Sequence, residues 1–168
     1  MTLSLRPPRQ SDYEALASWI PDATQCARWG GPYMPFPFTG SELPGLIARA
    51  PRIVAGEGST SFSLVEESSE SAPTLGFGQL VRQDRTAFRL ARLIIAPGKR
   101  GCGLGAALCQ LLIAKAQSVP EAQVVKLFVH PENAVAIRLY TKLGFVEAPP
   151  HPTPEMISMQ RNIERTAG

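Results

Sequence analysis

The glycine-rich segment between residues 92 and 105 has the composition of an anion-binding turn. It is written Arg-Leu-Ile-Ile-Ala-Pro-Gly-Lys-Arg-Gly-Cys-Gly-Leu-Gly, so an apolar run leads into Gly101, Gly103 and Gly105. Glycines lack a Cβ, which lets successive backbone N–H groups converge on one anion, and the N-terminus of a following helix adds partial positive charge. Residues 82–100 also carry six basic side chains against one acidic side chain. The segment therefore predicts a site for a multiply charged phosphate ligand.

Two common nucleotide-binding motifs fit this segment less well. Gly101, Gly103 and Ala106 satisfy the dinucleotide pattern G-x-G-x-x-A. That pattern belongs to a doubly wound sheet with an acidic residue about 20 positions on, and too little chain follows here to complete one. A Walker-type loop needs Gly-Lys-Ser or Gly-Lys-Thr, and neither occurs. Neither nucleotide-binding fold is favoured.

The elements that would position the turn are predicted from hydrophobic periodicity. Period-two patterns and short β-branched runs predict strands at residues 3–6, 59–65, 75–81, 86–95, 124–129, 145–148 and 156–160. Helical periodicity and cap residues predict helices at residues 12–20, 39–49, 104–118 and 133–143. These patterns predict an α/β domain with a mixed, mostly antiparallel sheet of about seven strands and about four helices.

Three local expectations accompany this assignment. Ser11 and Glu14 have the spacing of a capping box at the start of the first helix. Residues 28–39 contain three prolines and two adjacent glycines, which predicts an ordered apolar loop without regular structure. The nearly continuous apolar run at 124–129 predicts a strand that is buried on both faces.

Length and composition limit the classes of function. The 168 residues, 44% of them hydrophobic, suit a single domain over 1–168, with a ligand-binding core at about 86–146. Three cysteines without a C-x-x-C pair and two histidines predict no metal site. The net charge of +3 is too small to suggest nucleic-acid binding. Without a membrane-length apolar run or a signal-peptide pattern, we expect a cytoplasmic protein with no membrane association.

Two blocks of the sequence together resemble the GCN5-related N-acetyltransferases (GNAT family). Arg100, Gly103 and Gly105 fill the acyl-CoA motif R/Q-x-x-G-x-G/A of that family. The second block, Leu127-Phe-Val-His-Pro-Glu-Asn133 followed by Ala136, Leu139, Tyr140, Leu143, Gly144 and Phe145, is similar to the family pattern L-x-V-x-x-x-N-x-x-A-x-x-x-Y-x-x-x-G-F. The two blocks cover about 50 residues in the order and spacing typical of the family.

The resemblance implies an acetyl-CoA-dependent acyltransferase acting on a primary amine of a small molecule or peptide. The acetyl group would move by direct attack, with Tyr140 as the general acid beside the thioester sulfur. By the same resemblance the pyrophosphate would bind the backbone of Arg100, Gly101, Cys102, Gly103, Leu104 and Gly105. The pantetheine arm would contact Asn133 and the main chain of Leu93, Ile94 and Ile95. Homodimers are common in the family, whose acceptors also vary, so the oligomeric state and the acceptor stay open.

The general base is not identified by sequence. Many family members carry a glutamate on the strands facing the acceptor, but this sequence has Gln79 there, which cannot take a proton. Glu132, His130 or a chain of waters could serve instead, because an amine with a pKa near 10.4 must lose a proton before it attacks. The alternative function is a non-catalytic acyl-CoA-binding regulatory protein of the same fold.

Several of these residues also have purely structural interpretations. Tyr140 could be a core aromatic, Asn133 could be only a helix N-cap, and Arg89 and Arg92 could be surface charges on a strand. Trp29, Tyr33 and Phe36, together with Phe38 in the same proline-rich loop, could line the acceptor pocket beside Gln79. They could equally cover the hydrophobic core or form a dimer contact.

Overall fold

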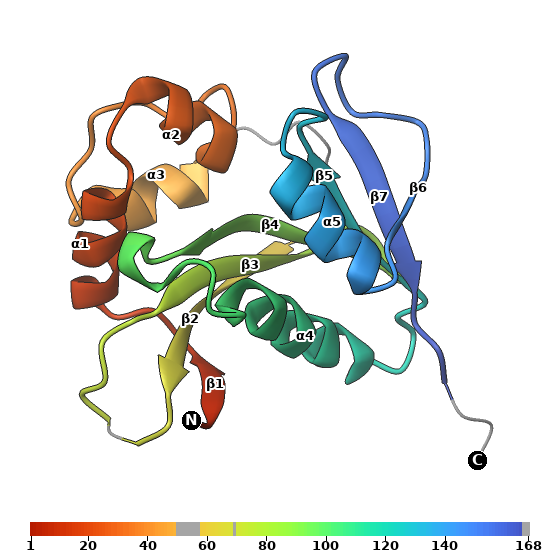
Figure 1. Ribbon diagram of the computed structural model, residues 1–168, viewed down its shortest axis with the longest axis horizontal. Coiled ribbons are helices and arrows are strands. Elements are labelled where there is room, and N and C mark those ends of the chain that lie inside the picture. Colours follow the sequence, from red (N-terminus) through yellow and green to blue (C-terminus); the bar gives the residue numbers. More distant parts are fainter. Residues whose placement is uncertain (50–57, 69, 166–168) are drawn as a thin grey trace.

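The computed structural model describes residues 1–49, 58–68 and 70–165. Seven strands form one sheet in the order β1-β2-β3-β4-β5-β7-β6 (Figure 1). Every neighbouring pair is antiparallel except β4 and β5, which are parallel. This confirms the predicted mixed, mostly antiparallel sheet. The strands are β1 (Leu3–Arg6), β2 (Gly58–Glu66), β3 (Gly76–Arg82), β4 (Ala87–Ile95), β5 (Val124–Val129), β6 (Val146–Glu147) and β7 (Ile157–Asn162).

The described part of the chain contains five α-helices and one 3₁₀ turn, one helix more than the approximate number expected. The helices are α1 (Gln10–Trp19), α2 (Ala23–Gly30), α3 (Leu43–Arg49), α4 (Leu104–Gln117) and α5 (Ala134–Lys142), and the 3₁₀ turn is η1 (Pro97–Lys99). The extra helix, α2, begins where Asp22 accepts a hydrogen bond from the Gln25 backbone. We expected a loop from Arg28 onward, but α2 continues to Gly30. The helix can extend this far because the prolines of the segment come only after Gly30.

The first helix begins one residue before the predicted capping box. Its N-cap is Arg9, whose backbone N–H donates to the Asp12 carboxylate at 2.8 Å, so the Ser11–Glu14 box is wrong. Asp12 also accepts hydrogen bonds from Arg6 on β1 at 2.5 Å and from Ser63 on β2 at 2.9 Å. Asp12 is 2% exposed. Its burial explains why it, and not the exposed Glu14, fixes the start of the helix.

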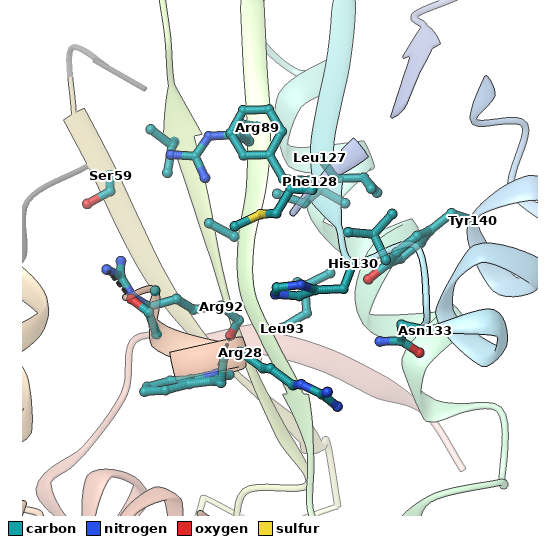
Figure 2. A pocket seen from close by; sticks show the side chains of 18 of the residues that line it. Arg28, Ser59, Arg89, Arg92, Leu93, Leu127, Phe128, His130, Asn133 and Tyr140 are labelled. Carbon is teal, nitrogen blue, oxygen red and sulfur yellow. Dashed lines mark hydrogen bonds between the residues drawn. The ribbon is translucent and has the colours of Figure 1, made fainter. Parts of the chain in front are cut away.

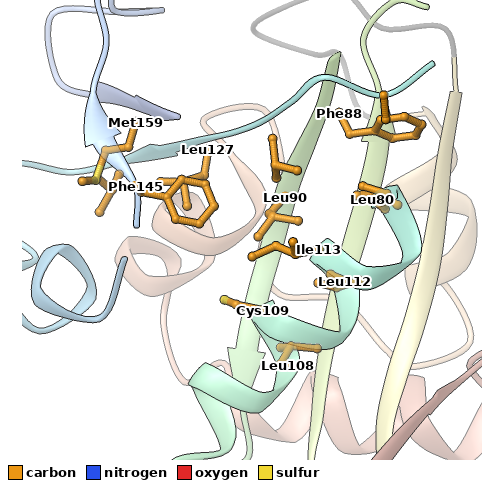
Figure 3. Packing of buried hydrophobic residues seen from close by; sticks show 14 of the residues in the cluster. Leu80, Phe88, Leu90, Leu108, Cys109, Leu112, Ile113, Leu127, Phe145 and Met159 are labelled. Carbon is orange, nitrogen blue, oxygen red and sulfur yellow. The ribbon is translucent and has the colours of Figure 1, made fainter. Parts of the chain in front are cut away.

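Different helices cover the two faces of the sheet. The largest hydrophobic cluster joins α4 to the sheet through Leu108, Leu112 and Ile113, and Figure 3 shows these side chains against Leu80 and Leu90. Partly buried residues of α5 pack on the same cluster. On the other face Phe77 of β3 lies between Leu16 of α1 and Leu43 of α3, and α2 packs beside them. The sheet thus separates α4 and α5 from α1, α2 and α3.

The parallel strands β4 and β5 are paired only at one end. The pairing joins Ala87–Arg89 to Val124–Lys126, and no further pair connects the two strands in the described residues. Just beyond it, the register between β3 and β4 shifts between Phe77 and Gln79, where Arg92 has a φ of 49°. A Cβ on Gly78 there would lie 2.9 Å from the ends of the Leu93 and Leu112 side chains, so any larger residue would have to displace both leucines. A bulge in β4 and a gap between the two strands result.

Burial along β5 differs from the sequence-based expectation. Its residues alternate between buried and half-buried, so one face of the strand is only partly covered. The gap beside β4 accounts for this exposure.

In the described residues, every helix is too short or too polar to cross a bilayer.

Candidate active site

Two hollows open at the gap between β4 and β5. The turn-side cleft lies among β4, the glycine turn, α4 and α5. The arginine-side hollow lies among α2, β4, β5 and the start of α5. Leu93 and Tyr140 line both. A molecule bound in one hollow can therefore meet a molecule bound in the other at these two residues.

The turn-side cleft is built around the glycine turn. Gly101 and Gly103 have φ values of 77° and 80°, which are left-handed, and Gly103 is the N-cap of α4. Such a turn exposes the backbone N–H groups at the helix N-terminus, where an anion binds. The Arg100 side chain folds back and donates to the Ile95 carbonyl at 3.1 Å. The described residues lining the cleft are Leu93, Ile94, Ile95, Lys99, Arg100, Gly101, Gly103, Leu104, Gly105, Ala106, Leu108, Cys109, Val135, Leu139 and Tyr140.

The backbone of β4 supplies polar groups to the gap. The Ala96 N–H donates to Leu75 at the edge of β3, at 2.9 Å. Because hydrogen-bonding direction alternates along an antiparallel strand, Ile95 and Leu93 direct their N–H and C=O groups away from β3. The bond from Arg100 to the Ile95 carbonyl agrees with this direction. An extended ligand arm beside β4 would meet these groups as a strand does.

Tyr140 projects from α5 at the junction of the two hollows. Its ring packs edge-on against Phe145, with ring centroids 6.0 Å apart. Burial raises the pKa of the Tyr140 phenol, and the neighbouring Cys109 raises it further. Burial likewise raises the pKa of Cys109 to about 12, so both groups stay protonated at neutral pH. Tyr140 therefore carries a protonated hydroxyl at the junction of the two hollows.

Asn133 has an observed structural role. Its side-chain oxygen accepts a hydrogen bond from the Ala136 N–H at 3.2 Å, which makes it the N-cap of α5. It also lines the arginine-side hollow. The contact with a ligand arm implied by the family resemblance stays a prediction.

The arginine-side hollow has a volume of about 420 Å³, enough for a small molecule. Figure 2 shows the side chains of His130 and Tyr140 directed toward its middle. The Trp29 indole donates to the Arg92 carbonyl at 2.9 Å, and the Arg92 guanidinium donates to the Gly30 carbonyl at 3.1 Å. These two bonds attach the end of α2 to the bulge of β4.

Of the four residues predicted to contact the acceptor, the structure places only one in the described lining of a hollow. Trp29 lines the arginine-side hollow, whereas Tyr33 and Phe36 do not belong to the described lining of either hollow and are 65% and 37% exposed. Gln79 is buried behind the hollow. It accepts from Arg92 at 2.7 Å and donates to Ser61 at 3.0 Å. Arg92 is therefore built into the fold and is not a simple surface charge.

Other lining residues escaped the sequence analysis. Arg28 on α2 reaches across the mouth of the hollow to Glu132, with 3.7 Å between the charged atoms. Phe128 of β5 lies under the Arg89 guanidinium, 5.0 Å from its ring centroid. Val135 and Leu139 of α5 line the turn-side cleft. No sequence motif marks these positions as lining residues, because tertiary packing brings each of them into its hollow.

Among the residues that the structure describes, metal ligands do not gather at either hollow. Across the described residues, no group of three or more His, Cys, Asp or Glu side chains is close enough together to hold an ion.

Comparison with known proteins relates this architecture to acetyltransferases. The family model described as "Acetyltransferase (GNAT) domain" matches residues 2–146. Spermidine N-acetyltransferase from Vibrio cholerae, solved with CoA and spermine, superposes with a TM-score of 0.71 at 18% identity, covering 95% of each chain.

Two further solved structures agree. An aminoglycoside acetyltransferase solved with coenzyme A gives a TM-score of 0.69 at 20% identity, covering 96% of this chain and 95% of the other. The ribosomal-protein-S18-alanine N-acetyltransferase of Escherichia coli gives 0.64 at 21% identity, covering 99% and 97%. At these identities the likeness establishes the fold.

Proposed function

The chain belongs to the GNAT acetyltransferase family, and from that premise we propose that it moves the acetyl group of acetyl-CoA to a primary amine, with Tyr140 as general acid. The acceptor is a small-molecule or peptide amine. The observation that carries the proposal is the position of Tyr140, which lines both hollows where they meet.

The turn-side cleft suits the acyl-CoA. Its glycine turn leaves open space beside Gly101 and Gly103, where no atom would contact an added Cβ, and Lys99 and Arg100 add positive charge. The pyrophosphate of the cofactor would accept hydrogen bonds from the backbone between Arg100 and Gly105. The pantetheine arm would follow Leu93, Ile94 and Ile95 into the gap, with Asn133 at its far side.

The reaction follows from the meeting of the two hollows. An amine entering from the arginine-side hollow attacks the thioester carbonyl, so that a C–N bond forms while the C–S bond breaks. The departing thiolate takes the proton of Tyr140, whose raised pKa keeps that proton in place until it is needed. Main-chain N–H groups of β4 beside Leu93 would stabilise the negative charge that develops on the carbonyl oxygen.

Two side chains of the arginine-side hollow are candidates for the base. His130 and Glu132 both line it, and either could take the amine's proton directly or through water. Gln79 is already engaged with Arg92 and Ser61 and has no proton-accepting chemistry.

The position of Gln79 favours one alternative. A protein with this fold could bind acyl-CoA without catalysing transfer, because the glutamate of many relatives is absent there. The two functions differ in a simple assay, since only the enzyme releases free CoA thiol faster when an amine is added.

A calorimetric titration with acetyl-CoA tests the donor site. We expect binding by the natural protein and its loss in Gly103→Glu, whose carboxylate would repel the pyrophosphate. Gly103→Ala shows the effect of backbone strain alone, and Gly58→Glu, at an exposed glycine with open space around it, controls for the added charge. If the natural protein does not bind, or if Gly103→Glu binds equally well, the donor site is wrong.

A further inference from the structure

The hydrogen-bond ladder between β4 and β5 stops while both strands continue. Its rungs join Ala87–Arg89 to Val124–Lys126. In a parallel ladder of this register, the next rung is a hydrogen bond from the Phe128 N–H to the Leu90 C=O. Within the described residues the pairing ends before this rung, although both residues lie in strands and line the arginine-side hollow. The missing rung therefore leaves backbone groups available to a ligand.

The bonds between β5 and β7 fix the direction of the Phe128 backbone. The Ile163 N–H donates to the Gln123 C=O at 2.8 Å, and the antiparallel pairing continues without a break to Val129. Because hydrogen-bonding direction alternates along an antiparallel strand, Leu127 and Val129 face β7 as Gln123 does. Phe128 lies between them and directs both its N–H and its C=O toward β4.

The same alternation directs the Leu90 C=O into the gap. On the β3 side the Gln83 N–H donates to the Ala87 C=O at 2.9 Å, and the pairing stays regular as far as Ala91. Leu90 comes three residues after Ala87 and therefore faces β5. It is 2% exposed, and its C=O has no hydrogen-bond partner in the described part of the chain. Buried backbone groups are nearly always bonded, so this carbonyl indicates a polar partner from outside the chain.

A peptide group is the partner that this strand edge matches best. Phe128 presents a donor and an acceptor on the same edge, and one residue of an extended peptide exchanges hydrogen bonds with both. An ammonium group has only donors and a carboxylate has only acceptors, so neither pairs with both groups. Extended peptides recognise open strand edges in this way, through main-chain hydrogen bonds.

The position of this edge sets how far the paired peptide group lies from the reacting centre. Leu90 precedes Leu93 by three residues on β4, a rise of roughly 10 Å along an extended strand. The bulge at Arg92 shortens this span. Leu93 and Tyr140 mark the junction of the two hollows. Two extended residues span roughly 7 Å, so an amine about two residues from the paired peptide group reaches that junction.

We propose that the acceptor is a peptide whose main chain pairs with Phe128 at the open edge of β5, which brings its amine to the junction of the hollows. This inference rests on the proposed acetyl transfer and adds the substrate class. The pantetheine arm would follow Leu93, Ile94 and Ile95, which lie beyond the bulge. Donor and acceptor thus occupy different stretches of the gap.

Peptides and simple amines of comparable length test the substrate class. Tetra-alanine amide offers only its α-amine, and N-acetyl-Ala-Lys-Ala-Ala amide offers only its lysine amine, so acetylation of either supports the proposal and identifies the amine. The compounds 1-aminohexane and 6-amino-1-hexanol lack a peptide group. We expect their kcat/KM to be about thirtyfold lower, as loss of both bonds to Phe128 implies. An equal or higher value for either compound would overturn the proposal, and a preference for the amino alcohol would assign the edge to a hydroxyl.

Ester analogues of the better peptide test the pairing itself. Replacing one peptide N–H by an ester oxygen deletes a single hydrogen-bond donor and keeps the shape of an extended chain. We expect an ester at one of the peptide linkages to lower kcat/KM about fivefold, as loss of one hydrogen bond does. Values are compared per unprotonated amine, because an ester changes the pKa of an amine next to it. A series in which every ester matches the parent peptide would overturn the proposal.

An NMR titration separates this proposal from the proposed function, because binding requires no acetyl transfer. In the isotope-labelled natural protein with CoA bound, we expect the Phe128 amide proton to move downfield when either peptide is added. The amide protons of Leu127 and Val129, which face β7, are internal controls and should move less. This shift without acetylation of any amine would refute the enzyme function alone. An unshifted Phe128 proton with peptides that are acetylated, or an equal shift already produced by CoA, would refute the peptide site alone.

Discussion

The turn-side cleft and the arginine-side hollow meet at two residues, yet they are assembled in opposite ways. Most of the turn-side cleft comes from one continuous stretch, residues 93–109, completed by α5. The arginine-side hollow combines α2, α3, four strands of the sheet, the β5–α5 connection and Met156 near the end of the chain. One site is thus local in sequence, whereas the other exists only once the whole fold has formed.

Their supports differ in chemistry as well. Behind the turn-side cleft, α4 packs on the sheet through a hydrocarbon cluster around Leu108 and Leu112. The arginine-side hollow depends on directional polar contacts, from Trp29 to the Arg92 carbonyl and from Arg92 to Gln79. Hydrophobic packing tolerates small shifts, whereas hydrogen bonds weaken steeply with distance and angle. From this comparison we expect binding in the turn-side cleft to tolerate substitution better than binding in the arginine-side hollow.

Substituting Tyr140, which the two hollows share, should have the largest effect. We expect Tyr140→Phe to lower kcat by roughly one to three orders of magnitude, the contribution of a positioned general acid. Its affinity for acetyl-CoA should be kept, because the ring still packs on Phe145. Steady-state kinetics and calorimetry measure the two quantities. Tyr33→Phe, which removes a hydroxyl from an exposed ring, is the control, and an unchanged kcat in Tyr140→Phe would exclude the acid role.

The same contrast explains how far the sequence alone could go. The seven strands, α4 and α5 follow from local periodicity, and the order and spacing of Arg100, Gly103, Asn133 and Tyr140 identify the family. These features depend on neighbours along the chain, as does the geometry of the glycine turn. Sequence patterns therefore predicted the fold and the family correctly.

The arginine-side hollow was less predictable because it depends on contacts between distant segments. Arg28 meets Glu132 across more than a hundred residues, and Arg92 is fixed by α2 and β3 together. Aromatic composition alone drew attention to Tyr33 and Phe36, which the fold leaves exposed. Likewise, Asp12 caps α1 because Arg6 and Ser63 surround it, which the capping-box spacing of Ser11 and Glu14 could not indicate.

The next largest effect concerns how the free energy of unfolding depends on pH, through the buried carboxylate of Asp12, which anchors the start of α1 to β1 and β2. Burial would raise the pKa of Asp12, but hydrogen bonds from Arg6, the Arg9 backbone and Ser63 lower it below the ordinary value of 3.8. A carboxylate with a lowered pKa in the folded state stabilises the protein above pH 3.8, and that stability is lost as the pH falls through the folded-state pKa. Asp12→Asn should reduce the free energy of unfolding at pH 7 by about 1–3 kcal/mol, since it disrupts this network.

Urea unfolding as a function of pH measures this loss. The difference in unfolding free energy between the natural protein and Asp12→Asn should narrow as the pH is lowered below about 4. Glu14→Gln, at an exposed carboxylate on the same helix, is the control and should change stability little. A constant difference across the whole pH range would show that Asp12 stabilises the helix by packing and not by its charge.

The smallest expected effect is the most specific test of the contrast between the hollows. Trp29→Phe keeps an aromatic ring against Phe77 but removes the indole N–H that donates to the Arg92 carbonyl. Loss of one such bond costs about 1 kcal/mol, so kcat/KM for the amine should fall about fivefold while the dissociation constant for acetyl-CoA stays the same. Trp19→Phe is the matched control, because the Trp19 indole makes no hydrogen bond within the described residues. Equal losses toward both substrates would mean that the bulge of β4 serves the two hollows jointly, and the expected difference in sensitivity between the turn-side cleft and the arginine-side hollow would not hold.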